Sequence, residues 1–192
     1  QFSDFFRIFL QKKSKGMWLD TDVFIFRPFS YDTDQFYYCH EGKGRIGYPV
    51  IYLPNDHPII EEYENLLKQD TLMPNWLGFK RGKLRPFMWN LLSLDYSPSD
   101  LGITIYGNDG FSRLTKRHNC FHEAKSKDLF FHWTGKETDK LFKKENFNFF
   151  LNDSKYLGIH IHRKHWEKYP IVPDSFWDCL LYTSDAADEV VR

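Results

Sequence analysis

The sequence predicts an α/β domain with a mixed sheet and flanking helices. Residues 3–16 carry the pattern of an amphipathic helix, and an apolar strand pattern over residues 17–26 follows at once. A second strand pattern at residues 46–53 precedes a helix pattern at residues 58–69. Helices that alternate with strands are typical of α/β domains. A chain of 192 residues is long enough for one such domain with a sizeable core.

The first helix pattern has signals at both of its ends. Ser3 or Asp4 is placed to be the N-cap, cations stand at positions 12, 13 and 15, and Gly16 marks the C-terminal stop. Asp4 and Arg7 are three residues apart, so they are neighbours on the first turn. The sequence therefore predicts a helix, a tight glycine turn and then a strand.

Two carboxylates, Asp20 and Asp22, interrupt the apolar run of residues 17–26, which we otherwise expect to be one buried strand. Burying a carboxylate is costly unless a cation or hydrogen bonds compensate for it. Side chains alternate along a strand, so both acids would point the same way and would suit a hard divalent ion. The alternative is a strand end followed by an Asx-type turn, with both acids solvated.

A composite motif in this region resembles the sugar-binding region of the DXD-motif glycosyltransferases. It consists of Ser3-Asp4-x-x-Arg7, then Gly16-Met17-Trp18-Leu19-Asp20-Thr21-Asp22-Val23, then Arg27-Pro28. That group includes the glucosyltransferase domains of large clostridial toxins, the α-1,4-galactosyltransferases and capsular-polysaccharide transferases. Lys15 stands where the family commonly has Gly, and Trp18 stands at its usual Tyr position.

The resemblance implies a GT-A fold and a retaining hexosyltransferase that needs Mn²⁺ or Mg²⁺. The sugar would pass from a nucleoside diphosphate donor, such as a UDP-sugar, to a glycan or lipid-linked acceptor. Asp22 would bind the metal directly, and Asp20 would contact the ribose or, through water, the metal. Asp4 and Arg7 would bind hydroxyl groups of the donor sugar. The family has no agreed protein nucleophile, so no catalytic base is assigned.

Residues 107–116 extend the resemblance, because they are similar to the family's G-P-x-x-L-T turn-to-helix segment with Phe111 in place of Pro. The glycines beside Asn108 and Asp109 allow a close approach to a ligand, so both residues are candidates for donor binding. A plain turn would have the same letters.

Residues 156–166 resemble the family's C-terminal segment, which closes over the diphosphate and the metal. His160 falls at the matching His and Trp166 at the final Trp, so His160 is a candidate metal ligand and Trp166 a candidate donor contact. His160 and His162 would face one side of a strand. Coordination by both His160 and Asp22 would bring the ring within about 6 Å of the carboxylate. The alternative is a histidine that bonds a backbone carbonyl.

The remaining patterns predict further elements. Short strands are expected at residues 36–39, 104–106 and 130–133, and a packed helix at residues 86–94, which are apolar nearly all round. Pro49 indicates that the strand at residues 46–53 is an edge strand or carries a bulge. Asn55 or Asp56 is the expected cap of the helix at residues 58–69.

Both ends of the chain carry an expectation. Residues 179–189 match the translation of a transposon-type sequencing adapter, and residues 190–192 are expected to be artefact as well. We therefore expect the glycosyltransferase domain to be partial, at residues 1–178, and the tail to add no core. In the resembling family a nucleotide-binding βαβ portion precedes the first helix, so the uridine-binding half of the donor site is expected outside this chain. An inactive or non-catalytic sugar-binding fragment is therefore the first alternative.

A phosphatase of the haloacid dehalogenase type is the second alternative, since it also places Asp-x-Asp after an apolar strand. That motif usually has Thr or Val at the position of Phe24, and this chain has no later Gly-Asp-x-x-x-Asp metal site. With 26 basic and 26 acidic residues, nothing indicates a nucleic-acid partner. No apolar run reaches the roughly 18 residues of a membrane span. A bacterial enzyme of this kind would act in the cytoplasm or at the membrane surface, and a eukaryotic one in the Golgi lumen.

Overall fold

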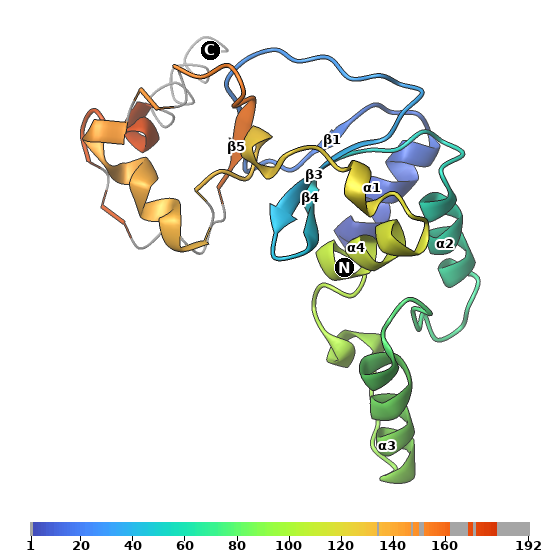
Figure 1. Cartoon of the computed structure of the whole chain (residues 1–192). Coiled ribbons are helices and arrows are strands. Elements are labelled where there is room, and N and C mark those ends of the chain that lie inside the picture. Colours follow the sequence, from blue (N-terminus) through green and yellow to red (C-terminus); the bar gives the residue numbers. More distant parts are fainter. Residues whose placement is uncertain are drawn as a thin grey trace, which may run out of the picture. The chain divides into compact units, whose positions relative to one another are not determined.

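A computed structural model describes residues 2–133, 135–146, 148–149, 152–161, 169–170 and 172–179. The chain divides into two compact units, which are described separately. Unit 1 comprises Gln1–Leu19 and Tyr31–Ser126, and unit 2 comprises Asp20–Ser30 and Lys127–Arg192. Both units combine helical segments with short strands (Figure 1), so the predicted α/β class is confirmed at this level. The predicted mixed sheet is wrong for the described residues, because both of their sheets are antiparallel.

Unit 1 contains a three-stranded antiparallel sheet in the order β1-β4-β3. Its strands are β1 (Trp18–Leu19), β4 (Arg45–Tyr52) and β3 (Tyr37–Gly42). The central strand β4 carries Pro49 where the register shifts, since Tyr38 pairs with Ile51 and the next residue, Cys39, pairs with Gly47. A proline cannot donate to the ladder, so it is tolerated at such an irregularity. The predicted bulge is confirmed, and the edge-strand alternative is wrong.

Three helices complete the core of unit 1. They are α1 (Phe2–Lys12), α2 (Pro58–Leu67) and α4 (Asn108–Arg117). Helix α4 packs on β4, and α1 packs on α2. Each helix contributes buried side chains to one cluster, among them Ile8, Tyr63 and Phe111. The helix expected after residue 3 and the helices expected near residues 58–69 and 107–116 are therefore present.

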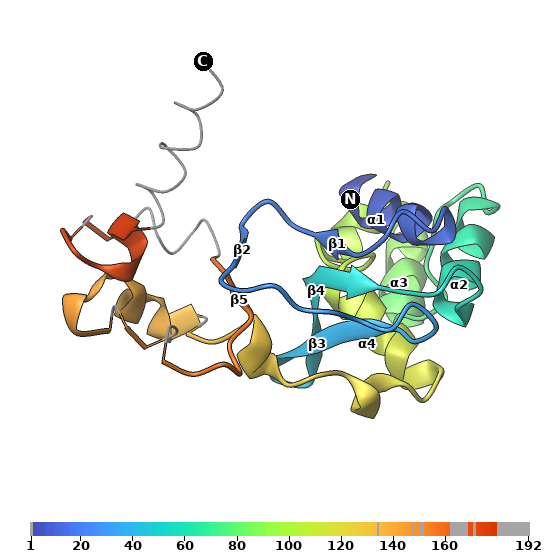
Figure 2. The ribbon, with the colours of Figure 1, turned by 90° about the horizontal axis from the view of Figure 1, so that it is seen from above.

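Unit 2 is organised around one antiparallel pair among its described residues, β2 (Val23–Ile25) with β5 (Gly158–His160), which lie side by side in Figure 2. Short 3-10 segments follow Lys127, at Lys127–Leu129, Gly135–Phe142 and Lys144–Asn146. The described core of this unit is largely aromatic and includes Trp133, Phe142, Tyr156, Phe176 and Trp177.

The single buried strand predicted over residues 17–26 is wrong. The chain forms β1 and β2 instead, with a turn between them in which the Val23 amide donates to the Asp20 carbonyl over 3.0 Å. The residues of both strands are half-buried or exposed. A carboxylate in a turn stays partly hydrated, which costs less than burying it inside a strand. The Asx-type turn that the sequence left open as an alternative is closer to the observed backbone.

Four smaller predictions are also corrected. Residues 104–106 and 130–133 form turns rather than strands. Helix α1 begins at Phe2, so Ser3 and Asp4 lie in its first turn and not at its N-cap. The cap of α2 is His57, whose ring nitrogen accepts from the Ile59 amide, and not Asn55 or Asp56.

The helix expected at residues 86–94 exists, but it is packed only in part, since Trp89 contacts the core cluster of unit 1 while Phe87, Met88 and Leu91 are exposed. It appears as α3 (Arg85–Leu91), preceded by a π-helical turn at Lys80–Leu84, and neither segment has a buried residue. Figure 1 shows α3 extending away from the other helices of unit 1. An apolar surface predicts burial only where a neighbouring element is available to cover it.

Residues 180–192 lie outside the described part of the chain, so the prediction that the tail adds no core stays a prediction. Cys39 and Cys120 are buried free thiols. Within the described ranges, no helix has both the length and the apolar character needed to cross a membrane.

Candidate functional site

In unit 1, the predicted donor-binding residue Arg7 is enclosed by two aromatic rings. Its guanidinium carbon lies 4.4 Å from the centroid of the Tyr48 ring and 5.3 Å from that of Trp18. Its Nη1 donates to the Tyr48 carbonyl oxygen over 2.9 Å. Arg7 is only 8% exposed, and a buried guanidinium needs such partners. Its role in holding α1 against the sheet is therefore shown, whereas its role in binding a sugar stays a prediction.

Asp4 lies one turn before Arg7, and its carboxylate faces the start of α4. A Cβ atom added at Gly107 would be 2.9 Å from Asp4 Oδ1, so glycine permits this close approach. The Tyr48 hydroxyl donates to the Asp4 carbonyl oxygen over 2.7 Å. Burial raises the pKa of Tyr48 well above its ordinary value, so the hydroxyl stays protonated and able to donate. The elements α1, β4 and α4 thus bring together Asp4, Arg7 and the segment that holds Asn108.

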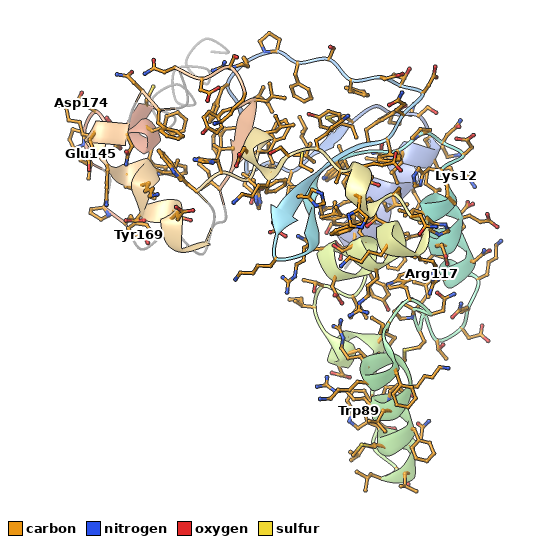
Figure 3. All side chains as sticks on the ribbon, viewed as in Figure 1. Lys12, Trp89, Arg117, Glu145, Tyr169 and Asp174 are labelled. Atoms are coloured by element: carbon orange, nitrogen blue, oxygen red, sulfur yellow. The ribbon has the colours of Figure 1, made fainter. Side chains whose placement is uncertain are left out.

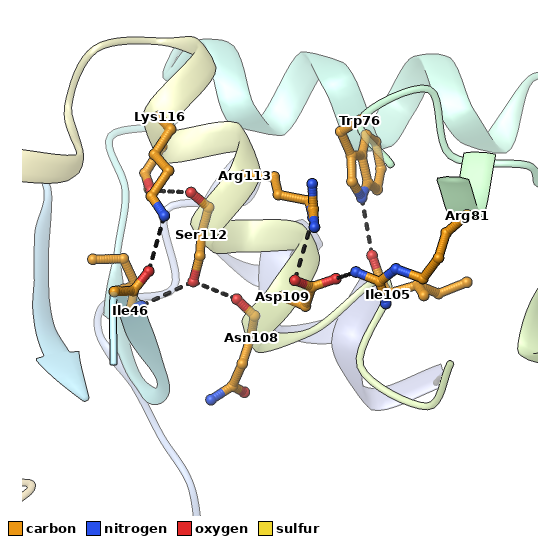
Figure 4. A network of polar contacts seen from close by, with 11 residues as sticks. Ile46, Trp76, Arg81, Ile105, Asn108, Asp109, Ser112, Arg113 and Lys116 are labelled. Atoms are coloured by element: carbon orange, nitrogen blue, oxygen red, sulfur yellow. Dashed lines mark hydrogen bonds and ion pairs between the residues drawn. The ribbon is translucent and has the colours of Figure 1, made fainter. Parts of the chain in front are cut away.

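The other two candidates of unit 1, Asn108 and Asp109, both contact side chains of the same unit. Asn108 Nδ2 donates to Glu41 Oε2 over 2.8 Å. Asp109 pairs with Arg81 and, over 3.2 Å, with Arg113 Nε (Figure 4). The pair with Arg81 ties the start of α4 to the segment before α3, whereas the pair with Arg113 lies within α4. The structure therefore gives Asp109 a structural role, and its donor-binding role stays a prediction.

In unit 2, the pairing of β2 with β5 brings Asp22 and His160 together. Val23 is the register partner of His160, and the Ile161 amide donates to the Asp22 carbonyl oxygen over 3.0 Å. The two side chains approach to 3.4 Å between His160 Nε2 and Asp22 Oδ1. The predicted approach of His160, on the last strand, to Asp22 is confirmed.

The two side chains differ in their exposure to solvent. The side chain of His160 is 8% exposed and packs edge-on against the Phe131 ring, while that of Asp22 is 43% exposed. The imidazole is thus held by the protein and the carboxylate reaches solvent. A ligand arriving from solvent would meet the carboxylate first.

The spacing of this pair is compatible with a shared metal ion. Two ligand atoms that each lie about 2.1 Å from one ion, at tetrahedral or octahedral angles, are about 3.0–3.5 Å apart. Carboxylate oxygen and imidazole nitrogen are also ligands that Mn²⁺ accepts. However, no group of three or more His, Cys, Asp or Glu side chains among the described residues is arranged to hold a metal. By itself the pair would supply only part of a coordination sphere.

Of the three remaining residues named in the sequence analysis, the structure describes one. Asp20 lies in the turn between β1 and β2, and its carbonyl accepts the turn hydrogen bond. Trp166 and His162 lie outside the described residues. Sequence reasoning also missed Tyr48 as the residue that links Asp4 to Arg7. The only available signal was its position in the strand pattern that follows the first helix.

Two hollows on the described surface of unit 1 lie away from the α3 segment. An apolar groove of about 590 Å³ runs beside α1 and is lined by Phe2, Phe5, Phe6, Phe9 and Tyr106 among others. A polar pocket of about 680 Å³ is lined by residues that include Asp56, His57, Glu123 and Lys125. Neither hollow was predicted, because each joins segments that are distant in the sequence.

No protein-family model, curated protein or solved structure matches this chain. The resemblance to the DXD-motif glycosyltransferases therefore depends on the composite motif in the sequence.

Proposed function

We propose that this chain is part of a metal-dependent, retaining glycosyltransferase that uses a nucleoside diphosphate sugar, such as a UDP-sugar, as donor. The acceptor is a glycan or a lipid-linked sugar. The observation that carries the proposal is the 3.4 Å approach of Asp22 Oδ1 to His160 Nε2, between two residues that the motif assigns to the same metal ion. The GT-A fold belongs to this proposal as well.

The chemistry of the proposal follows from the leaving group. Departure of a nucleoside diphosphate develops negative charge, and a bound Mn²⁺ or Mg²⁺ would neutralise part of it. Asp22 and His160 hold the cation, and Asp20 contacts the ribose or a metal-bound water. Asp4 and Arg7 hydrogen-bond the hydroxyl groups of the donor sugar. Asn108, Asp109 and Trp166 are the further donor contacts of the proposal.

The first test measures metal binding directly, so that it does not depend on turnover. Titration of the chain with Mn²⁺, followed by the electron paramagnetic resonance signal of the free ion, should show binding that strengthens when UDP is present. Asp22→Asn is nearly isosteric and removes one charged ligand, so binding should weaken by about 10- to 100-fold with an unchanged circular dichroism spectrum.

Unit 2 contains a matched control for this variant. His132 Nδ1 lies 3.4 Å from Asp128 Oδ1, which is the same kind of pair at the same distance. The proposal gives this second pair no metal, so Asp128→Asn should leave Mn²⁺ binding unchanged. Equal losses in both variants would show a nonspecific charge effect. Sugar-nucleotide binding that persists unchanged without metal would favour the non-catalytic alternative.

A further inference from the structure

Helix α3 carries large apolar side chains into solvent. Phe87 is 64% exposed, Leu91 is 73% exposed and Leu92 is 61% exposed, and Met88 and Leu94 are also exposed. In contrast, α1, α2 and α4 each bury a face in the core of unit 1. Contiguous apolar side chains on a surface mark a site of interaction.

The segment is attached to unit 1 rather than detached from it. Arg81 pairs with Asp109 at the start of α4 (Figure 4). Trp89, which is labelled on α3 in Figure 3, contacts the tilted ring of Tyr96 with 4.8 Å between the ring centroids and packs against the core cluster. These contacts hold the helix on one side, so the exposed side chains of α3 are presented in a defined orientation.

Exposed cations accompany the apolar side chains. Lys80, Lys83 and Arg85 are exposed, and no acidic residue occurs anywhere in residues 79–94. The cations lie in the π-helical turn and at its junction with α3, whereas the apolar side chains follow within α3 and just after it. A basic segment joined to an apolar helix surface is typical of helices that lie in the interface of an anionic membrane.

We propose that α3 is a docking surface for an anionic membrane. Phe87, Leu91 and Leu92 enter the boundary between headgroups and acyl chains, while Lys80, Lys83 and Arg85 contact the lipid phosphates. This proposal rests on α3 alone and does not depend on the proposed transferase activity.

Charge favours a membrane over a second copy of the chain. In a two-fold dimer the same patch faces itself, so the cations of one copy would lie near those of the other. Residues 79–94 contain no carboxylate of their own that could compensate for this repulsion. An anionic lipid surface supplies the opposite charge for all three cations.

The test is flotation of the whole 192-residue chain with lipid vesicles. Vesicles of phosphatidylcholine alone are compared with vesicles that contain equal parts of phosphatidylcholine and phosphatidylglycerol. Because three cations act at the surface, binding to the anionic vesicles should be at least about tenfold stronger and should weaken as salt is added.

Two double variants separate the apolar and the charged contributions. Phe87→Ser with Leu91→Ser should reduce binding to anionic vesicles by about tenfold or more, because both side chains would lose their burial in lipid. Lys80→Glu with Lys83→Glu should reduce it by a similar factor. The matched controls are Leu67→Ser, at an exposed leucine of α2, and Lys43→Glu with Lys68→Glu, which makes the same change in net charge at exposed lysines elsewhere. The controls should bind as the unaltered chain does.

Three results would overturn the proposal. One is the absence of binding to anionic vesicles by a chain whose circular dichroism shows that it is folded. Another is equal binding of the variants and their controls. The third is a dimer, detected by light scattering, that is lost in the Phe87→Ser, Leu91→Ser variant while no vesicle binding occurs, since that would assign the patch to a second copy.

Discussion

The secondary structure of unit 1 forms mainly from neighbouring residues, whereas that of unit 2 depends on residues that are distant in the sequence. In unit 1, β3 and β4 form a hairpin, and three helices cover an aliphatic and aromatic core. In unit 2, the described strand pair joins Val23–Ile25 to Gly158–His160, and its described core is mostly aromatic.

The difference matters for the candidate site. The contacts of Arg7 with Trp18 and Tyr48 are held by a helix and a sheet of unit 1, while Asp22 meets His160 only if a short long-range strand pair forms. Pairing over a long stretch of chain costs loop-closure entropy before any contact compensates for it. The Asp22–His160 pair should therefore be the less stable of the two arrangements.

The largest expected effect is in the core of unit 1. A Cβ atom at Gly110 would lie 2.1 Å from the Ile105 carbonyl oxygen, which also accepts a hydrogen bond from Trp76 Nε1 over 2.9 Å. Gly110→Ala must displace the backbone, so the free energy of unfolding should fall by about 3 kcal/mol or more. Urea unfolding followed by circular dichroism measures this change.

Gly78→Ala provides the control for that substitution. The nearest atom to a Cβ there is the mobile end of the Arg113 side chain, at 3.3 Å, so the loss should stay within about 0.5 kcal/mol. Equal unfolding midpoints for the two variants would contradict the close packing of α4.

A smaller and more local effect is expected in unit 2. A Cβ atom at Gly158 would lie 2.4 Å from the Phe24 carbonyl oxygen, so Gly158→Ala should break the pairing of β2 with β5 at a cost of about 2 kcal/mol. Hydrogen exchange followed by mass spectrometry should show lost protection in Val23–Ile25 and Gly158–His160. Protection in β3 and β4 should be retained, and its loss there would show that the two units unfold together.

The smallest effect is a pH dependence in unit 1. Burial lowers the pKa of His57 to about 4 from its ordinary value of 6.5, with a smaller contribution from His118. Between these two values the unfolded chain binds a proton that the folded chain does not, so stability is complete above about pH 6.5 and falls as the pH decreases towards 4. The loss near pH 5.5 should be about 1–2 kcal/mol.

His57→Asn keeps a side-chain acceptor at the cap of α2 and removes the titration, so unfolding curves from pH 7 to pH 4.5 should become less steep in their pH dependence. His122→Asn, at an exposed histidine of the same unit, is the control. An unchanged dependence in the His57 variant would exclude this histidine as its source.

The sequence alone was sufficient to predict features whose signal lies within a few neighbouring residues. The apolar spacing of Ile59, Ile60, Tyr63 and Leu66 predicted the buried face of α2, and Pro49 indicated either the bulge that β4 has or an edge strand. These signals are local because helix periodicity and the missing amide of proline act within a few residues. The composite motif likewise named Asp4, Arg7, Asp20 and Asp22, and its resemblance supplied His160.

The tertiary structure decided what each pattern packs against. The apolar residues of α3 predicted a packed helix, yet no described element covers Phe87 or Leu91, which remain exposed. The apolar residues of 17–26 predicted one strand, yet they form two strands that pair with different neighbours, β1 with β4 and β2 with β5. Tyr48 supports both Asp4 and Arg7, and no local pattern indicates this. The physical reason is that periodicity determines which face of a segment is apolar, whereas burial and hydrogen bonding depend on segments far away in the sequence.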